Sequence, residues 1–300
     1  MGENKSVWLV QASEGFGLLQ YGKALDKVEF RRAAAVLLKI VDELKKSPSP
    51  PDGEWRTASM ADFQEAFVED FGDGSEMTRD FRKDCLSDLF FCFGDSAFAA
   101  LELADGDIQK MTTVIDFFWA RIVELNKSLA PVNGLLAKMF EESSDESKPA
   151  EDTDAKIFHL YAYMYLLLVG GFLADSARLF YFHTTIKEKK KILNVAQLQE
   201  KSVRNITEEL TNIPIFLQNW DGIVNISNAI SQANAIYIPE KDDVHLISRN
   251  QFTQREEYNE VMDLNDFVVR ACKLKDTLEA FILVRDMVQV SLIILYLGGF

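Results

Sequence analysis

Apolar residues recur every three or four positions along most of this chain, which is the spacing that places them on one face of an α-helix. Helical segments are predicted at Glu29–Lys46, Met60–Phe71, Ile108–Leu125, Ala155–Leu193 and Tyr258–Phe300. The alternation typical of strands is scarce, and short strands are expected only near Tyr237–Pro239 and Val244–Ile247. The pattern predicts an all-α fold, either one large helical bundle or two helical lobes, around a central, very apolar helix.

One stretch, Glu141–Asp154, consists mainly of acidic and small polar residues and has no large apolar side chain. Such a stretch cannot contribute to a hydrophobic core, so it is predicted to be an acidic flexible linker or loop. It would separate an N-terminal helical lobe, residues 1–140, from a C-terminal helical lobe, residues 155–300. A long loop inside one helical domain would fit the same composition.

The segment Ile157–Ala174 carries no formal charge. A helix that is apolar on every face has to be covered by other helices or by lipid. Because the segment is shorter than the roughly 20 residues that span a bilayer, we expect a central, buried helix of a water-soluble protein. Membrane contact through this segment, or through the similar C-terminal segment Met287–Phe300, is the alternative, as in pore-forming proteins that release buried helices into a bilayer.

Composition narrows the classes of function. The 300 residues are 48% hydrophobic and include 47 acidic and 32 basic residues, for a formal net charge of -15. A field of this sign repels a phosphate backbone, so nucleic-acid binding is not expected. Only three cysteines occur, none in a CxxC pair, and the first ten residues lack the features of a secretory signal. We therefore expect a cytoplasmic protein.

Cofactor and metal motifs are missing from the sequence. Gly15-Phe16-Gly17 begins like a dinucleotide-binding fingerprint, but Gln20 stands where the third glycine is needed. There is no GxxxxGK[ST], GxSxG or HExxH pattern. His159 and His183 lie too far apart along one predicted helix to share an ion. No cofactor and no metal are expected.

One spacing fits a catalytic site, because four residues separate Arg178 from His183. This R-x4-H spacing resembles the signature of the HEPN family of helical ribonucleases. The resemblance implies an RNA-cleaving site in which His183 is the acid or base at a ribose 2′-hydroxyl or leaving group, while Arg178 steadies the phosphate. It covers six residues, and the intervening Leu-Phe-Tyr-Phe departs from the polar residue that family members usually place there.

With no other catalytic constellation in the sequence, we expect a non-catalytic protein that acts through helix-mediated association with a protein partner or with itself. Two alternatives stay open. One is a HEPN-like RNA-cleaving enzyme that uses Arg178 and His183. The other is a membrane-active or pore-forming helical protein.

Overall fold

A computed structural model describes residues 77–100, 105–143, 150–189, 191–250, 252–253 and 255–298. Most of these residues are helical, which confirms the predicted helical content, but a small three-stranded sheet accompanies the helices. The all-α class is therefore too narrow. The predicted helices Glu29–Lys46 and Met60–Phe71 lie outside the described residues. By its contacts the chain forms two compact units, one of residues 1–102 with 279–300 and one of residues 103–278.

The first unit contains α4, Arg79–Ala100, and the C-terminal part of α11, Leu264–Gly298. Side-chain contacts join these helices within the described residues. The rings of Phe93 and Phe281 meet edge to face with centroids 5.7 Å apart. The guanidinium of Arg82 donates a hydrogen bond of 2.7 Å to the carboxylate of Glu279. An aromatic contact and an ion pair therefore hold α4 against α11 within this unit.

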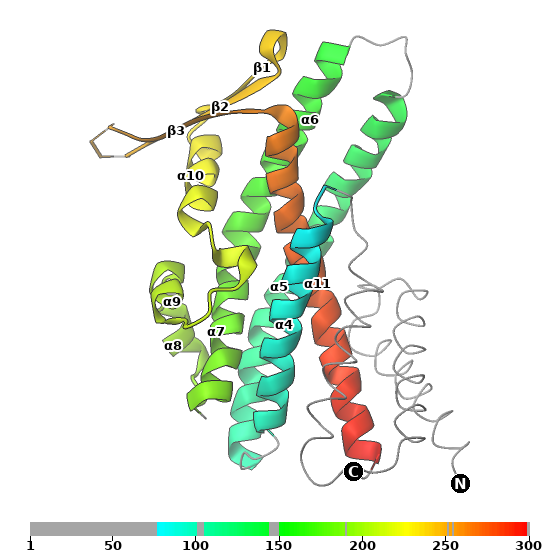
Figure 1. Cartoon of the computed structure of the whole chain (residues 1–300), viewed down its shortest axis with the longest axis vertical. Helices are drawn as coiled ribbons and strands as arrows, with labels where there is room; N and C mark the ends of the chain where they lie inside the picture. The colour runs from blue at the N-terminus through cyan, green and yellow to red at the C-terminus, as the bar shows by residue number, and fades with distance from the viewer. Residues whose placement is uncertain are drawn as a thin grey trace. The chain divides into compact units, whose positions relative to one another are not determined.

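The second unit is built around one long helix (Figure 1). Its first part is α6, Ala150–Leu168, and its second part is α7, Ala174–Lys189, joined by the π-helical turn η1, Val169–Leu173. Helix α5, Asp105–Ser143, packs against all three. The described residues of the predicted linker, 141–143 and 150–154, are helical and lie within this unit. The predicted lobes, residues 1–140 and 155–300, divide the chain differently from these two compact units. That division stays a prediction.

Short helices follow α7 along one side of the long helix (Figure 1). They are α8, Val195–Gln199, α9, Val203–Glu209, the 3-10 turn η2, Ile215–Leu217, and α10, Trp220–Ser231. Local capping explains where two of them begin. Asn194 and Gln197 form a reciprocal capping box, and the Ser202 hydroxyl accepts a hydrogen bond from the Asn205 amide.

The sheet consists of β1, Ala235–Ile238, β2, Asp243–Arg249, and β3, Glu256–Asp263, antiparallel and in the order β1-β2-β3. The 3-10 turn η3, Pro239–Lys241, follows β1. The inner face carries Val244, Leu246 and Met262, all buried, and α10 packs against β1 and β2. Phe158 of α6 joins the sheet to α11, because its ring lies 6.1 Å from that of Tyr237 and 5.3 Å from that of Phe267.

The strands expected near Tyr237 and Val244 are confirmed, but the helix predicted from Tyr258 is wrong at its start. Residues up to Asp263 form β3, and α11 begins at Leu264. Tyr258 and Met262 are four residues apart and fit a helical face, yet in the structure they pair with Ser248 and Val244 of β2. Cross-strand pairing thus overrides the local pattern.

The apolar segment Ile157–Ala174 is covered on most of its surface, but not on all of it. Phe158, Tyr165 and Leu168 are buried, whereas His159 and Tyr163 are exposed. The expectation that every face would be buried is therefore too strong. One stripe along the helix remains open.

Two neighbouring leucines test this division of the helix. Leu168 is fully buried and Leu167 only partly so. We expect Leu168→Asp to lower the free energy of unfolding by about 3–5 kcal/mol, because it leaves an unpaired charge in the core. Leu167→Asp should cost about 1 kcal/mol, because its carboxylate can reach water. Chemical denaturation of both variants measures the difference, and equal losses would contradict the placement of the stripe.

Candidate functional site

The π-helical turn η1 directly precedes Asp175, a buried carboxylate on the long helix. The flanking residues Leu168 and Ala174 keep helical backbone angles, so the helix continues through the turn. A Cβ atom built on Gly171 would lie 3.0 Å from a methyl group of Leu125, which shows how closely α5 approaches here. Such turns insert an extra residue and often occur at functional sites.

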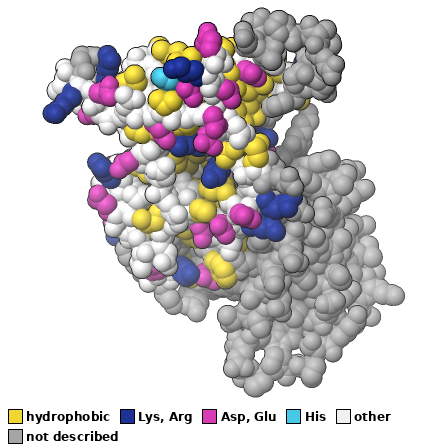
Figure 2. All heavy atoms as spheres, turned by 45° about the horizontal axis from the view of Figure 1, so that its top comes forward, with side chains coloured by type: hydrophobic (Ala, Val, Ile, Leu, Met, Phe, Trp, Pro, Cys, Tyr) yellow, Lys and Arg dark blue, Asp and Glu magenta, His cyan; other side chains and the backbone are white. Residues whose placement is uncertain are grey.

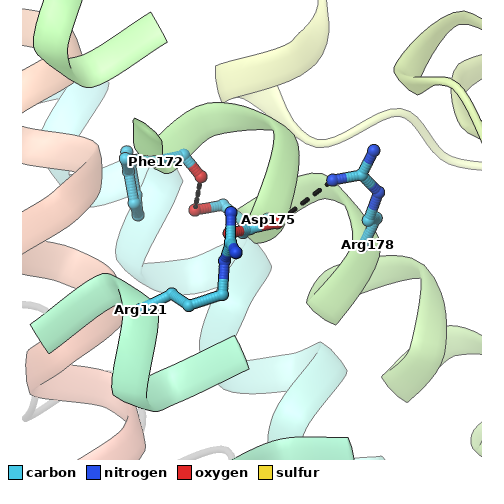
Figure 3. A network of polar contacts seen from close by, with 5 residues as sticks. Arg121, Phe172, Asp175 and Arg178 are labelled. Carbon is cyan, nitrogen blue, oxygen red and sulfur yellow. Dashed lines mark hydrogen bonds and ion pairs between the residues drawn. The ribbon is translucent and has the colours of Figure 1, made fainter. Parts of the chain in front are cut away.

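Asp175, in the first turn of α7, is buried and held by two arginines (Figure 3). Its Oδ2 atom accepts a hydrogen bond of 2.5 Å from Nε of Arg121 on α5. Its Oδ1 atom accepts one of 3.1 Å from Nη1 of Arg178, one turn later on α7. Only 4% of the Asp175 side chain is exposed, against 54% for Arg121 and 20% for Arg178. The carboxylate thus cross-links α5 to α7.

The chemistry open to this cluster follows from its charges. Two guanidinium groups and one carboxylate leave a net charge of +1, and each carboxylate oxygen accepts an arginine N–H group. An ionised carboxylate engaged in this way is a fixed acceptor rather than a free base. The neighbouring Ser176 hydroxyl donates a hydrogen bond of 2.9 Å to the Phe172 carbonyl, within the same helix. The cluster is therefore suited to positioning helices.

The two residues predicted to be catalytic both lie on α7, but the structure does not bring them to a common face. Five positions along a helix turn a side chain by about 140° and advance it by about 7.5 Å. Arg178 is engaged by Asp175. His183 is buried, and its ring meets that of Phe182 with centroids 5.9 Å apart. The resemblance to an RNA-cleaving site stays a hypothesis.

Burial also sets the protonation state of His183. Desolvation of the imidazolium lowers the pKa of His183 to about 3, far below its ordinary value. The imidazole is therefore neutral near pH 7 and a weak base. A general acid or base works best with a pKa near the operating pH, so this residue does not have that property.

A second polar cluster joins α7 to α9. The Tyr181 hydroxyl donates to the Glu209 carboxylate, which also accepts from the ammonium of Lys201. That ammonium lies 4.9 Å from the centre of the Tyr181 ring. Burial is the largest cause that raises the pKa of Tyr181, followed by its hydrogen bond to Glu209. The cluster fixes α9 on α7 and keeps the phenol protonated.

The sequence indicates only part of these polar clusters, and the described residues form no metal site. Within the described residues, no three His, Cys, Asp or Glu side chains gather to hold an ion. The sequence offers one hint of Asp175, since this acid ends the uncharged segment and Arg178 follows one turn later. No comparable signal marks Arg121, which lies 54 residues earlier.

From His159 to Gly170 the exposed side of the long helix carries no formally charged residue. We define the α6 stripe as His159, Tyr163, Leu166, Leu167 and Gly170. His159, Tyr163 and Gly170 are exposed, with 53% for Tyr163, and the two leucines are partly exposed. At Gly170 an added Cβ would meet no atom within 4 Å. The stripe is therefore an open, smooth face of a helix that is apolar elsewhere.

By length and composition, one helix among the described residues, Thr153–Glu188, could cross a membrane. In its most apolar window 56% of the residues are buried, which also suits the core helix of a soluble protein. Comparison with protein-family models, with curated proteins and with solved structures gave no match for the chain.

The Asp175 cluster predicts how stability responds to loss of one charge. In Asp175→Asn the mostly buried Arg178 loses its counter-ion, and we expect the free energy of unfolding to fall by about 3–5 kcal/mol. The matched variant Arg121→Gln removes the more exposed partner and should cost about 1 kcal/mol. Urea denaturation distinguishes the two. A loss below 1 kcal/mol for Asp175→Asn would show that the carboxylate does not hold the helices together.

His183 predicts a dependence of stability on pH. Because its pKa is about 3 in the folded state, the unfolded chain binds a proton first, below the ordinary pKa of about 6.5. The contribution of the neutral imidazole is complete above that pH and is lost as the pH falls toward 3, by up to about 1.4 kcal/mol per pH unit. Compared with wild type, His183→Gln should lose stability less steeply between about pH 6 and 4. Parallel slopes in thermal unfolding would contradict the buried, neutral histidine.

Proposed function

We propose that this protein is a non-catalytic association module that binds a helix of a protein partner, or of a second copy, along the α6 stripe. The observation that carries the proposal is an uncharged, partly exposed helix face in a protein with a net charge of -15. Isolated exposed apolar residues are ordinary, but a row of them at helical spacing is typical of helix-in-groove and helix–helix recognition.

The shape of the stripe supports a helix as the occupant. Tyr163 supplies an aromatic anchor, and aromatic residues are enriched among the residues that carry binding energy. Gly170 leaves room for a second backbone to approach closely, because no side chain fills the space above it. The Asp175 cluster lies just beyond the stripe and fixes the helix against α5. A helix held in this way loses little freedom on binding, which favours affinity.

The membrane-active alternative has one observation in its favour, since Thr153–Glu188 is long and apolar enough to span a bilayer. Against it stands the length of the uncharged segment Ile157–Ala174, which is shorter than the roughly 20 residues that span a bilayer and is followed directly by Asp175. A cytoplasmic location is part of the association proposal. The RNA-cleaving alternative has no comparable observation in its favour.

Site-specific photocrosslinking tests the proposal. A benzophenone amino acid at position 163 should give protein adducts in the host cell, whereas one at Ile213, an exposed apolar residue of another segment, should not. Adding Leu167→Asp should lower the adduct yield about tenfold, because a charge in an apolar contact costs more than about 1.4 kcal/mol.

Two outcomes would refute the proposal. The first is an adduct yield at position 163 no higher than at position 213. The second is adducts with lipid alone, which would favour the membrane-active alternative. Circular dichroism of each variant confirms that the helices are intact, so that a lost adduct reports on binding.

A further inference from the structure

The outer face of the sheet is a second open apolar surface. In an antiparallel sheet, directly paired residues point to the same side. Ile236, His245 and Val261 are paired across the three strands, and they lie opposite the buried inner face. Ile236 is 57% exposed and Val261 is 52% exposed. We call this row, together with Ile238 and Ile247 on the same side, the outer sheet face.

One end of this face is acidic. Asp243 and Asp263 are directly paired across β2 and β3 on the same side as the outer sheet face. Like charges in this position repel each other. Asp242, in the adjoining turn, lies toward the inner side instead, because it accepts a hydrogen bond of 3.0 Å from the Tyr237 hydroxyl and its charge, after burial, raises the pKa of Asp154 on α6. Figure 2 shows hydrophobic, acidic and basic side chains mixed on the described surface that faces the viewer.

The charges nearby do not cancel this acidity. Lys241 is the basic residue of the turn, beside Glu240 and Asp242. His245 approaches the Asp243 carboxylate only to 3.9 Å. Asp263 accepts a hydrogen bond of 2.7 Å from the backbone amide of Asp266, in the first turn of α11. The acidic end therefore favours a cation from outside.

The size of the face decides what fits it. Strand spacing and rise make a three-stranded face with seven-residue β2 roughly 10 Å by 20 Å, or about 200 Å². A stable dimer buries about 800 Å² on each partner, so a second copy is not the natural occupant. An amphipathic helix of about three turns is roughly 16 Å long and fits this area.

We propose that the outer sheet face docks a short amphipathic helix of a protein partner, with the apolar side of that helix on Ile236 and Val261 and a basic residue at Asp243 and Asp263. The proposal goes beyond the α6 stripe, since it assigns a different surface and a partner chemistry. It rests on the proposed function only because it assumes that the protein acts by associating with a protein partner.

The test uses two labelled synthetic peptides of about 14 residues with leucines at helical spacing, one with lysines and one with glutamates in its last turn. Fluorescence anisotropy measures their binding to the full chain. The lysine peptide should bind with at least tenfold higher affinity than the glutamate peptide. Asp243→Asn should reduce that preference several-fold. The double variant Ile236→Thr/Val261→Thr keeps β-branched residues in the strands and should weaken the lysine peptide about tenfold.

Ile213→Thr is the matched control, because it removes an exposed isoleucine outside the sheet and should leave binding unchanged. The proposal is overturned if neither peptide saturates binding at millimolar concentration, or if Ile213→Thr weakens binding as much as the double variant. A dimer in sedimentation that the double variant dissociates would make a second copy the occupant and overturn it too. If the double variant does not fold, the effect of Asp243→Asn on the peptide preference decides. Leu167→Asp should leave peptide binding unchanged. Failure of the proposal for the outer sheet face can therefore be distinguished from failure of the proposal for the α6 stripe.

Discussion

For 18 residues, from Ile157 to Ala174, the chain carries no charge, and a helix of this kind has to be kept out of water. The second unit is arranged around that requirement. Helix α5 packs along the helix, and the sheet, α10 and the start of α11 cover its first half through Phe158. What these elements leave open is the α6 stripe. The surface that we propose for association is thus the part of the helix that these elements do not cover. It is uncharged because it belongs to the same uncharged segment.

The long helix becomes polar at Asp175, where a buried carboxylate needs partners. Arg121 and Arg178 supply them, and this fixes the register of α7 on α5. The π-helical turn just before it lets Gly171 approach Leu125 and directs Asp175 toward Arg121. Desolvation offsets much of the attraction in such an ion pair, but removal of one partner is costly because it leaves a buried charge without its counter-ion. The main consequence of the ion pair is a rigid helix that can present the α6 stripe without distortion.

Elements that depend on local periodicity could be predicted from the sequence. Features that depend on contacts between distant residues could not. The helical content and the positions of β1 and β2 followed from short-range pattern. The strand from Glu256 to Asp263 did not, because Tyr258 and Met262 fit a helical face equally well until β2 pairs with them. The contact between Asp175 and Arg121 could not be predicted from local pattern either, since Arg121 lies on another helix.

The central claim is that other parts of the protein cover the uncharged helix and leave only a stripe for a protein partner. Flotation with vesicles of phosphatidylcholine and phosphatidylglycerol tests it most directly, because lipid is the one other environment that could cover such a helix. We predict that the full chain stays in the dense, lipid-free fraction at physiological salt. Flotation with the vesicles, lost in Tyr163→Asp while the helical circular dichroism spectrum is unchanged, would contradict the account and assign the stripe to a membrane.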